Sequence, residues 1–197
     1  MSTSVATTTA PDTTGGSIRT LRNLYYVRFG FAIAWAVSMM VVAETIDAGT
    51  VVLLVIYPLF DLAAAVVDFR SAGATRARAP LYINMGSSLL TTVGLGFAVG
   101  SGIPDVLRVW GFWAITAGLV QLIVAVLRYR LGGQWAMILS GGISVLAGSS
   151  FVLMAGAADA SLTTIAGYAA LGGVFFLISA IRLHRTTAKA ADHSAIA

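Results

Sequence analysis

The stretch VLRVWGFWAITAGLVQLIVAVLR, residues 106–128, decides the fold class. Between its first residue and its terminal arginine it contains a single charged side chain, Arg108. A helix needs about 20 predominantly apolar residues to cross about 30 Å of hydrocarbon. Residues 106–128 meet that length, and they lack the alternating polar positions of an outer-membrane strand. We therefore predict a membrane-spanning helix.

The rest of the chain repeats this pattern. Apolar runs lie at about 24–44, 50–69, 81–100, 106–128, 133–155 and 161–182. Hydrophobic residues make up 58% of the chain and charged residues 10%, whereas soluble domains carry about 25% charged residues. This composition excludes a soluble enzyme, a coiled coil and a disordered protein. It predicts an all-α integral membrane protein with six transmembrane helices within residues 19–185.

Polar segments flank the six runs. Residues 1–18 are rich in Ser, Thr and Gly and have no basic residue ahead of an apolar run, so we expect a disordered tail without a secretory signal. Residues 186–197 are predicted to form a second polar tail. Ten of the 12 lysines and arginines lie on the side of the helices that carries both tails. By the positive-inside rule, both termini are expected in the cytoplasm and the protein in the inner or plasma membrane.

The even-numbered runs resemble one another. A shift of 60 residues places the second run on the fourth, and a further shift of 55 places the fourth on the sixth, which aligns Asp61, Gln121 and Phe176. We predict three repeated helical hairpins. Small residues recur at helical spacing, including Gly111 and Gly118 in the fourth run and Gly96 and Gly100 in the third, and we interpret them as helix-packing positions.

Asp61 is the most informative side chain because it lies near the middle of an apolar run. An intramembrane carboxylate costs about 2.5–3.5 kcal/mol on insertion scales, so it marks a functional hypothesis. Asp61 either accepts a proton or contacts an ion, or it is hydrogen-bonded and holds helices together. Gln121 and Asn84 complete a candidate intramembrane polar site, and both are predicted to make hydrogen bonds between helices. Arg28 and Asp68 form a candidate structural ion pair at the cytoplasmic ends of the first two runs.

Other chemistry is not expected. The chain has no cysteine, and its two histidines lie close to the C-terminus. No nucleophile set, phosphate loop or metal-ligand cluster appears, so we expect no catalytic residues, no cofactor, no metal and no nucleic-acid partner. Trp110 and Trp113 are predicted to lie in an interfacial aromatic belt. The expected partner is the lipid bilayer, with a second copy of the chain or another membrane protein as further candidates.

Runs four to six carry a familiar pattern. GFWAITAG at 111–118 followed by Gln121, and Trp135 followed by LSGGISVLAG at 139–148, resemble the HdeD-like membrane proteins. The resemblance covers roughly residues 24–185 and is strongest over 108–185. That family often has Glu where Gln121 stands, and Asn-Pro where this chain has Ala155 and Gly156. Because glutamine does not titrate, the first difference weakens a titrating role for position 121.

The resemblance implies a six-helix, non-enzymatic inner-membrane protein with a role in acid or envelope stress, since the family's namesake is an acid-resistance protein. The alternative is a small proton- or solute-conducting membrane protein that uses Asp61, with Gln121 and Asn84 along the path.

Overall fold

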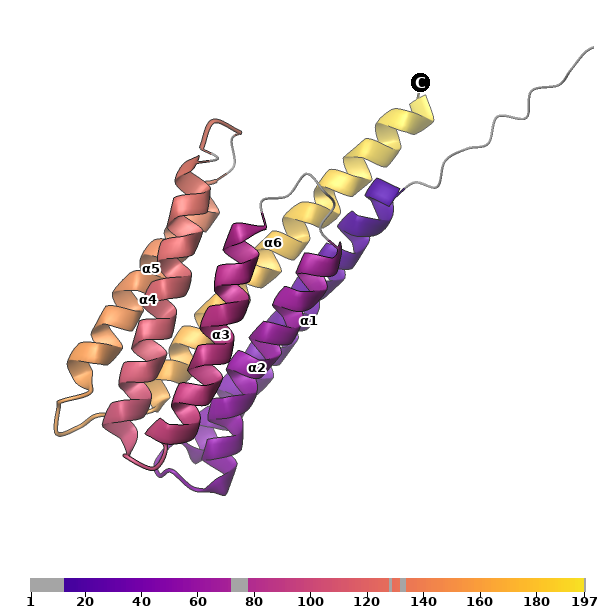
Figure 1. Cartoon of the computed structure of the whole chain (residues 1–197). Coiled ribbons are helices and arrows are strands. Elements are labelled where there is room, and N and C mark those ends of the chain that lie inside the picture. Colours follow the sequence, from indigo (N-terminus) through magenta and orange to yellow (C-terminus); the bar gives the residue numbers. More distant parts are fainter. Residues whose placement is uncertain (1–12, 72–77, 128, 132–133, 197) are drawn as a thin grey trace, which may run out of the picture.

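The computed structural model describes residues 13–71, 78–127, 129–131 and 134–196, with backbone alone for 13–18, 131 and 186–196. The described residues contain no strand. They form the following elements: α1 (Thr13–Val42), α2 (Ala48–Ser71), α3 (Ala79–Ala98), α4 (Ile103–Leu127), the short 3-10 helix η1 (Tyr129–Leu131), α5 (Trp135–Met154) and α6 (Thr163–Ile196) (Figure 1). The predicted all-α class is confirmed.

Five of the six α-helices are long and apolar enough to cross a membrane, namely α1, α2, α4, α5 and α6. Helix α3 has 20 residues, but it is less apolar because it carries Asn84, Ser88 and Thr91. Two of these polar side chains, Asn84 and Ser88, hydrogen-bond to Asp61 of α2. The polarity of α3 is thus directed into the protein. That α3 also spans a membrane remains a prediction.

Both flanking segments are more helical than the sequence suggested. Helix α1 begins at Thr13, inside the segment 1–18 that was predicted to be disordered, and residues 1–12 lie outside the described residues. Helix α6 continues to Ile196 through most of the predicted polar tail. The start of α1 and the end of α6 lie at the same end of the bundle (Figure 1).

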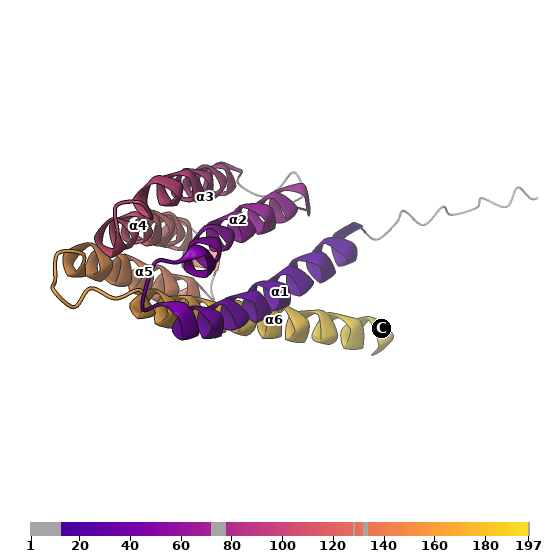
Figure 2. The same cartoon turned by 90° about the horizontal axis from the view of Figure 1, so that it is seen from below.

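The six helices follow one another around a ring, and α6 closes it by packing against α1 (Figure 2). The most extensive contacts join successive hairpins, α4 with α5 and α1 with α6. Glycine permits the first of these contacts, because a Cβ on Gly118 would lie 2.6 Å from the carbonyl oxygen of Gly141. Gly111 stands in the same relation to Gly148, at 2.6 Å. The packing interpretation of these glycines is confirmed.

Not every predicted small-residue position packs in this way. In α3, a Cβ on Gly96 would meet nothing within 4 Å. Helix α3 therefore contacts its neighbours through other residues, and its glycine spacing alone was misleading.

The first turn of α2 is fixed by a polar cap. The Thr50 amide donates to Asp47 Oδ1 at 2.8 Å, which satisfies one of the free N–H groups at the helix start. The backbone and side-chain hydrogen bonds of Thr50 lower the pKa of Asp47 below its usual value. The Thr50 hydroxyl also donates to the carbonyls of Val42 and Thr45, so the cap joins α2 to the end of α1.

The end of the bundle that lies away from the chain termini is filled by an apolar core to which all six α-helices or their ends contribute. Its centre is an aromatic cluster in which Trp35 stacks on Trp110 and Tyr57 meets both rings, with centroids 4.7–5.4 Å apart. Trp110 is fully buried and Trp113 is 7% exposed, so the prediction that these two belong to an interfacial belt is wrong. The sequence places them near the start of a run, but α4 begins at Ile103, which sets Trp110 two turns inside the helix.

The outer surface is also apolar, but its side chains are exposed and not buried. Large apolar side chains on several helices are strongly exposed, among them Leu90, Phe97, Leu127, Leu146 and Leu153. Apolar exposure on this scale is expected where lipid, and not water, surrounds a helix bundle.

Candidate functional site

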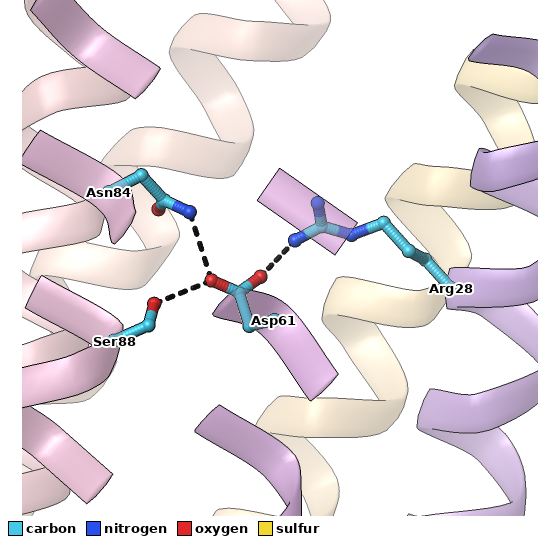
Figure 3. A network of polar contacts seen from close by, with 4 residues as sticks. All are labelled: Arg28, Asp61, Asn84 and Ser88. Carbon is cyan, nitrogen blue, oxygen red and sulfur yellow. Dashed lines mark hydrogen bonds and ion pairs between the residues drawn. The ribbon is translucent and has the colours of Figure 1, made fainter. Parts of the chain in front are cut away.

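The candidate site is centred on Asp61, halfway along α2. Asp61 is 8% exposed, and its Oδ1 accepts a hydrogen bond from Arg28 Nη2 of α1, which forms a buried ion pair (Figure 3). Side-chain exposure is 14% for Arg28 and 11% for Asp61. Removal of a charge from water is costly, and a close partner of opposite sign offsets part of that cost.

The second carboxylate oxygen of Asp61 faces α3. Asp61 Oδ2 accepts a bond of 2.9 Å from Asn84 Nδ2 and one of 2.7 Å from Ser88 Oγ (Figure 3). Asn84 and Ser88 are four residues apart, so both lie on one face of α3. Asp61 thereby joins three helices, α1, α2 and α3.

The expected ion pair between Arg28 and Asp68 is replaced by the pair between Arg28 and Asp61. Asp61 and Asp68 are seven residues apart, two helical turns, so they lie on the same face of α2 about 10 Å from each other. The packing of α1 on α2 places the guanidinium beside the deeper carboxylate. That carboxylate has less access to water and gains more from a cationic donor.

Asp61 lies in the wall of a cavity of about 470 Å³ that all six helices line. The positions that the repeat aligns, Asp61, Gln121 and Phe176, all face this cavity. So do Asp68 and Arg182, which lie toward the end of the bundle where α2 ends. This convergence of equivalent positions is what a repeat of three hairpins predicts.

The cavity is one-sided. Its lining runs from the exposed Arg182 to Tyr57, Trp113 and Tyr168 near the middle of the bundle. Beyond Tyr57 and Trp113, the interior of the helix bundle is filled by the apolar core that contains Trp110. A polar solute that enters beside Arg182 therefore meets the buried ion pair before it meets an apolar barrier.

Among the residues that the structure describes, several polar groups in the cavity wall have donors or acceptors that no protein group satisfies. Within the described residues, Gln121 and the Tyr57 hydroxyl make no hydrogen bond, and the Arg28 guanidinium, which has five N–H donors, bonds to Asp61 alone. The Arg28 guanidinium also lies 4.3 Å from the ring centroid of Phe176, a cation–π contact that holds it against α6.

The inner end of the cavity is closed by a further polar contact. The Tyr168 hydroxyl donates to Ser144 Oγ at 3.1 Å, which links α6 to α5 where few other contacts join them. Tyr168 also meets the ring of Phe151 edge-on, at a centroid distance of 5.7 Å. This pair, with Tyr57 and Trp113, forms the floor of the cavity.

Sequence reasoning singled out Asp61, Asn84, Gln121 and Arg28, and the structure brings all four to one cavity. Asp61 contacts Arg28 and Asn84 directly, whereas Gln121 shares the cavity without a bond to them. Ser88 was missed, although its spacing of four from Asn84 was a usable signal. Tyr57, Ser144 and Tyr168 were missed as well, because hydroxyl-bearing residues are common in membrane helices.

In the part of the chain that the structure describes, no three His, Cys, Asp or Glu side chains gather as metal ligands do. The arrangement is suited to binding, because a guanidinium with spare donors lies beside a buried carboxylate in the cavity wall.

The fold and the site together define a class, that of multi-pass helical membrane proteins with a charge-paired polar cavity. No family model, curated protein or solved structure matches the chain.

Proposed function

We propose that this chain is a non-enzymatic multi-pass membrane protein that admits protons or a small polar solute from one side to the Arg28–Asp61 pair. The observation that carries the proposal is the position of this pair in the wall of a one-sided cavity. A pair that only joined helices would need no cavity beside it. The unbonded amide of Gln121, at the aligned position across the cavity, adds a polar group that a solute or water can contact.

The physiological setting that we propose is resistance to acid or envelope stress. It rests on the resemblance of runs four to six to the HdeD-like proteins. A site that combines a carboxylate with access from one side suits such a role, since its charge state responds to the proton concentration on that side.

The proposed orientation places both termini and the mouth of the cavity in the cytoplasm. Arg182 lies at the mouth, and most other basic residues lie at the same end of the chain's helices. The positive-inside rule supports this direction. Helix α3 would then span the membrane with the other five.

The test is survival of a strain that lacks the gene after an acid challenge. We expect wild type and the control Asp105→Asn, which alters a solvent-exposed carboxylate paired with Arg108, to restore survival. We expect Asp61→Asn, at equal membrane abundance, to fail. Equal rescue by Asp61→Asn would show that no titrating group at this position is needed, and the proposal would be wrong.

A second test measures conduction across the membrane, which requires the apolar core beyond the cavity to open during transport. Full-length protein in vesicles that enclose a pH-sensitive dye should pass protons under an imposed pH gradient, with or without added solute. Asp61→Asn should reduce this flux to that of empty vesicles, while Asp105→Asn should not. Absence of flux with every solute tested, together with normal acid survival of the strain that lacks the gene, would contradict the proposed function.

A further inference from the structure

We propose that the cavity binds a small organic carboxylate with an apolar body, and that one proton enters the site with it. Arg28 turns from Asp61 to the carboxylate of the ligand while Asp61 takes up the proton. This inference rests on the proposed function and names the class of its solute.

The hydrogen-bond donors in the cavity wall outnumber the protein acceptors near them. The three hydrogen bonds to Asp61 occupy most of the acceptor sites of its carboxylate. The guanidinium of Arg28 keeps four N–H donors without a protein acceptor in the described residues, and Gln121 and Tyr57 contribute further donors. A ligand that fills this cavity must therefore be rich in acceptors. Guanidinium groups bind carboxylates through two parallel bonds.

The charges in the cavity wall balance one another. Among the described residues, the charged and titratable side chains that line the cavity come from three helices: Tyr25 and Arg28 of α1, Tyr57, Asp61 and Asp68 of α2, and Tyr168 and Arg182 of α6. The lining residues of α3, α4 and α5 are neutral. With the phenols protonated, the formal charges of these side chains sum to zero, because two arginines balance two aspartates. An anion alone would leave one uncompensated negative charge in a poorly hydrated site, whereas an anion and a proton together keep the site neutral.

The exchange of partners balances without a redox step. Asp61 gains one proton and becomes a neutral carboxylic acid that still accepts bonds from Asn84 and Ser88. Arg28 keeps its charge and exchanges one carboxylate partner for another. No unpaired charge is left at any point, so the site changes ligand occupancy without exposing a buried ion.

Much of the cavity wall is apolar. Aromatic rings surround the polar groups along the cavity, including Tyr57, Trp113, Phe175 and Phe176. Its volume of about 470 Å³ lies in the usual range of small-molecule sites and exceeds what a formate or acetate needs. An aromatic or branched aliphatic acid would fill both the polar and the apolar parts.

The probes are benzoate and benzenesulfonate, titrated calorimetrically into the full-length protein in detergent between about pH 5 and about pH 8. Benzenesulfonate stays an anion throughout, so any pH dependence of its binding belongs to the protein. We expect both to bind more weakly as the pH rises, with the dissociation constant increasing up to about tenfold per pH unit for one coupled proton. Binding of benzoate without benzenesulfonate would mean entry of the neutral acid, and would overturn the exchange at Arg28.

Three variants test which side chain binds the anion and which takes up the proton. Asp61→Asn imitates the protonated carboxylate, so benzenesulfonate should bind it at least as tightly as wild type at low pH and without pH dependence. Asp68→Asn should keep the pH dependence. Arg28→Gln should lose at least tenfold in affinity, while the control Arg108→Gln, at an exposed pair, should not. If benzenesulfonate binding to Asp61→Asn still depends on pH, the proposal is overturned.

Folding is monitored separately. If Arg28→Gln fails to fold, Gln121→Leu is the alternative, because it removes a donor from the cavity wall without breaking the ion pair, and it should weaken both anions. Tight binding of benzyltrimethylammonium with none of either anion would make the ligand a cation and overturn the inference. Absence of anion binding with Asp61-dependent proton flux intact would overturn this inference alone and leave the proposed function standing.

Discussion

Replacement of Asp61 by leucine tests the polar centre of the bundle most directly. The change removes the acceptor of three hydrogen bonds and leaves the Arg28 guanidinium without an anionic partner. Both side chains are less than 15% exposed, so water compensates little. Loss of one partner of a buried pair costs about 3–5 kcal/mol, and we expect Asp61→Leu to lower the free energy of unfolding by that amount.

The double variant Arg28→Met, Asp61→Leu separates the charge from the remaining bonds. It removes the orphaned cation but leaves the Asn84 and Ser88 donors without their acceptor, at a cost of about 1–3 kcal/mol for an unsatisfied buried group. We therefore expect the double variant to be more stable than Asp61→Leu alone by about 1–3 kcal/mol.

The assay is denaturant unfolding in detergent micelles, followed by tryptophan fluorescence. Trp35 and Trp110 stack at 5.4 Å in the core and report its disruption. The control is Asp105→Ala, which breaks the exposed pair with Arg108 and should cost less than about 1 kcal/mol. If Asp61→Leu is as stable as the control, or if the double variant is no more stable than the single one, the ion pair does not hold these helices together.

Three further predictions concern packing, capping and access. Gly141→Ala should destabilise the bundle by about 1–3 kcal/mol, because its Cβ would lie 2.9 Å from a carbonyl oxygen of α4, whereas Gly142→Ala meets nothing within 4 Å and should be neutral or stabilising in the same unfolding assay. The lowered pKa of Asp47 means that its cap stabilises the fold above about pH 4 and loses this effect as the pH falls through its folded-state value, so the difference in thermal midpoint between wild type and Asp47→Ala should shrink on acidification. Because the chain has no cysteine, Ser140→Cys in the cavity wall should react with a water-soluble thiol reagent and Leu107→Cys in the core should not, and reaction of both would contradict a one-sided cavity.

The helices themselves were predictable because their signal is local. Each apolar run is long enough to span hydrocarbon, and the observed helices overlap these runs with boundaries that differ by a few residues, apart from the extensions at Thr13 and Ile196. The sequence does not predict the extensions, because a polar composition is typical of disordered segments. Helix formation at the end of an existing helix avoids the cost of nucleation, so a polar segment can continue one.

The partner of Arg28 was not predictable because two candidates occupy one face of α2. Asp61 and Asp68 have the same helical phase, and only the offset between α1 and α2 along their axes decides between them. That offset depends on the packing of the whole ring, which no local pattern contains. The burial of Trp110 has the same origin, since its depth depends on where α4 begins and not on its place in the apolar run.

Stability and function place opposite demands on Arg28 and Asp61. Buried ion pairs are often no more stable than apolar residues of similar volume, so helix association alone gives little reason for a charge pair in the middle of a membrane bundle. A quadruple variant combines Arg28→Met and Asp61→Leu with apolar replacements of Asn84 and Ser88. It removes every unsatisfied partner of the pair. We expect it to approach wild-type stability and to lose anion binding, proton flux and rescue of acid survival together. If it folds and still rescues survival, the buried pair only joins α1, α2 and α3, and the cavity beside it serves another purpose.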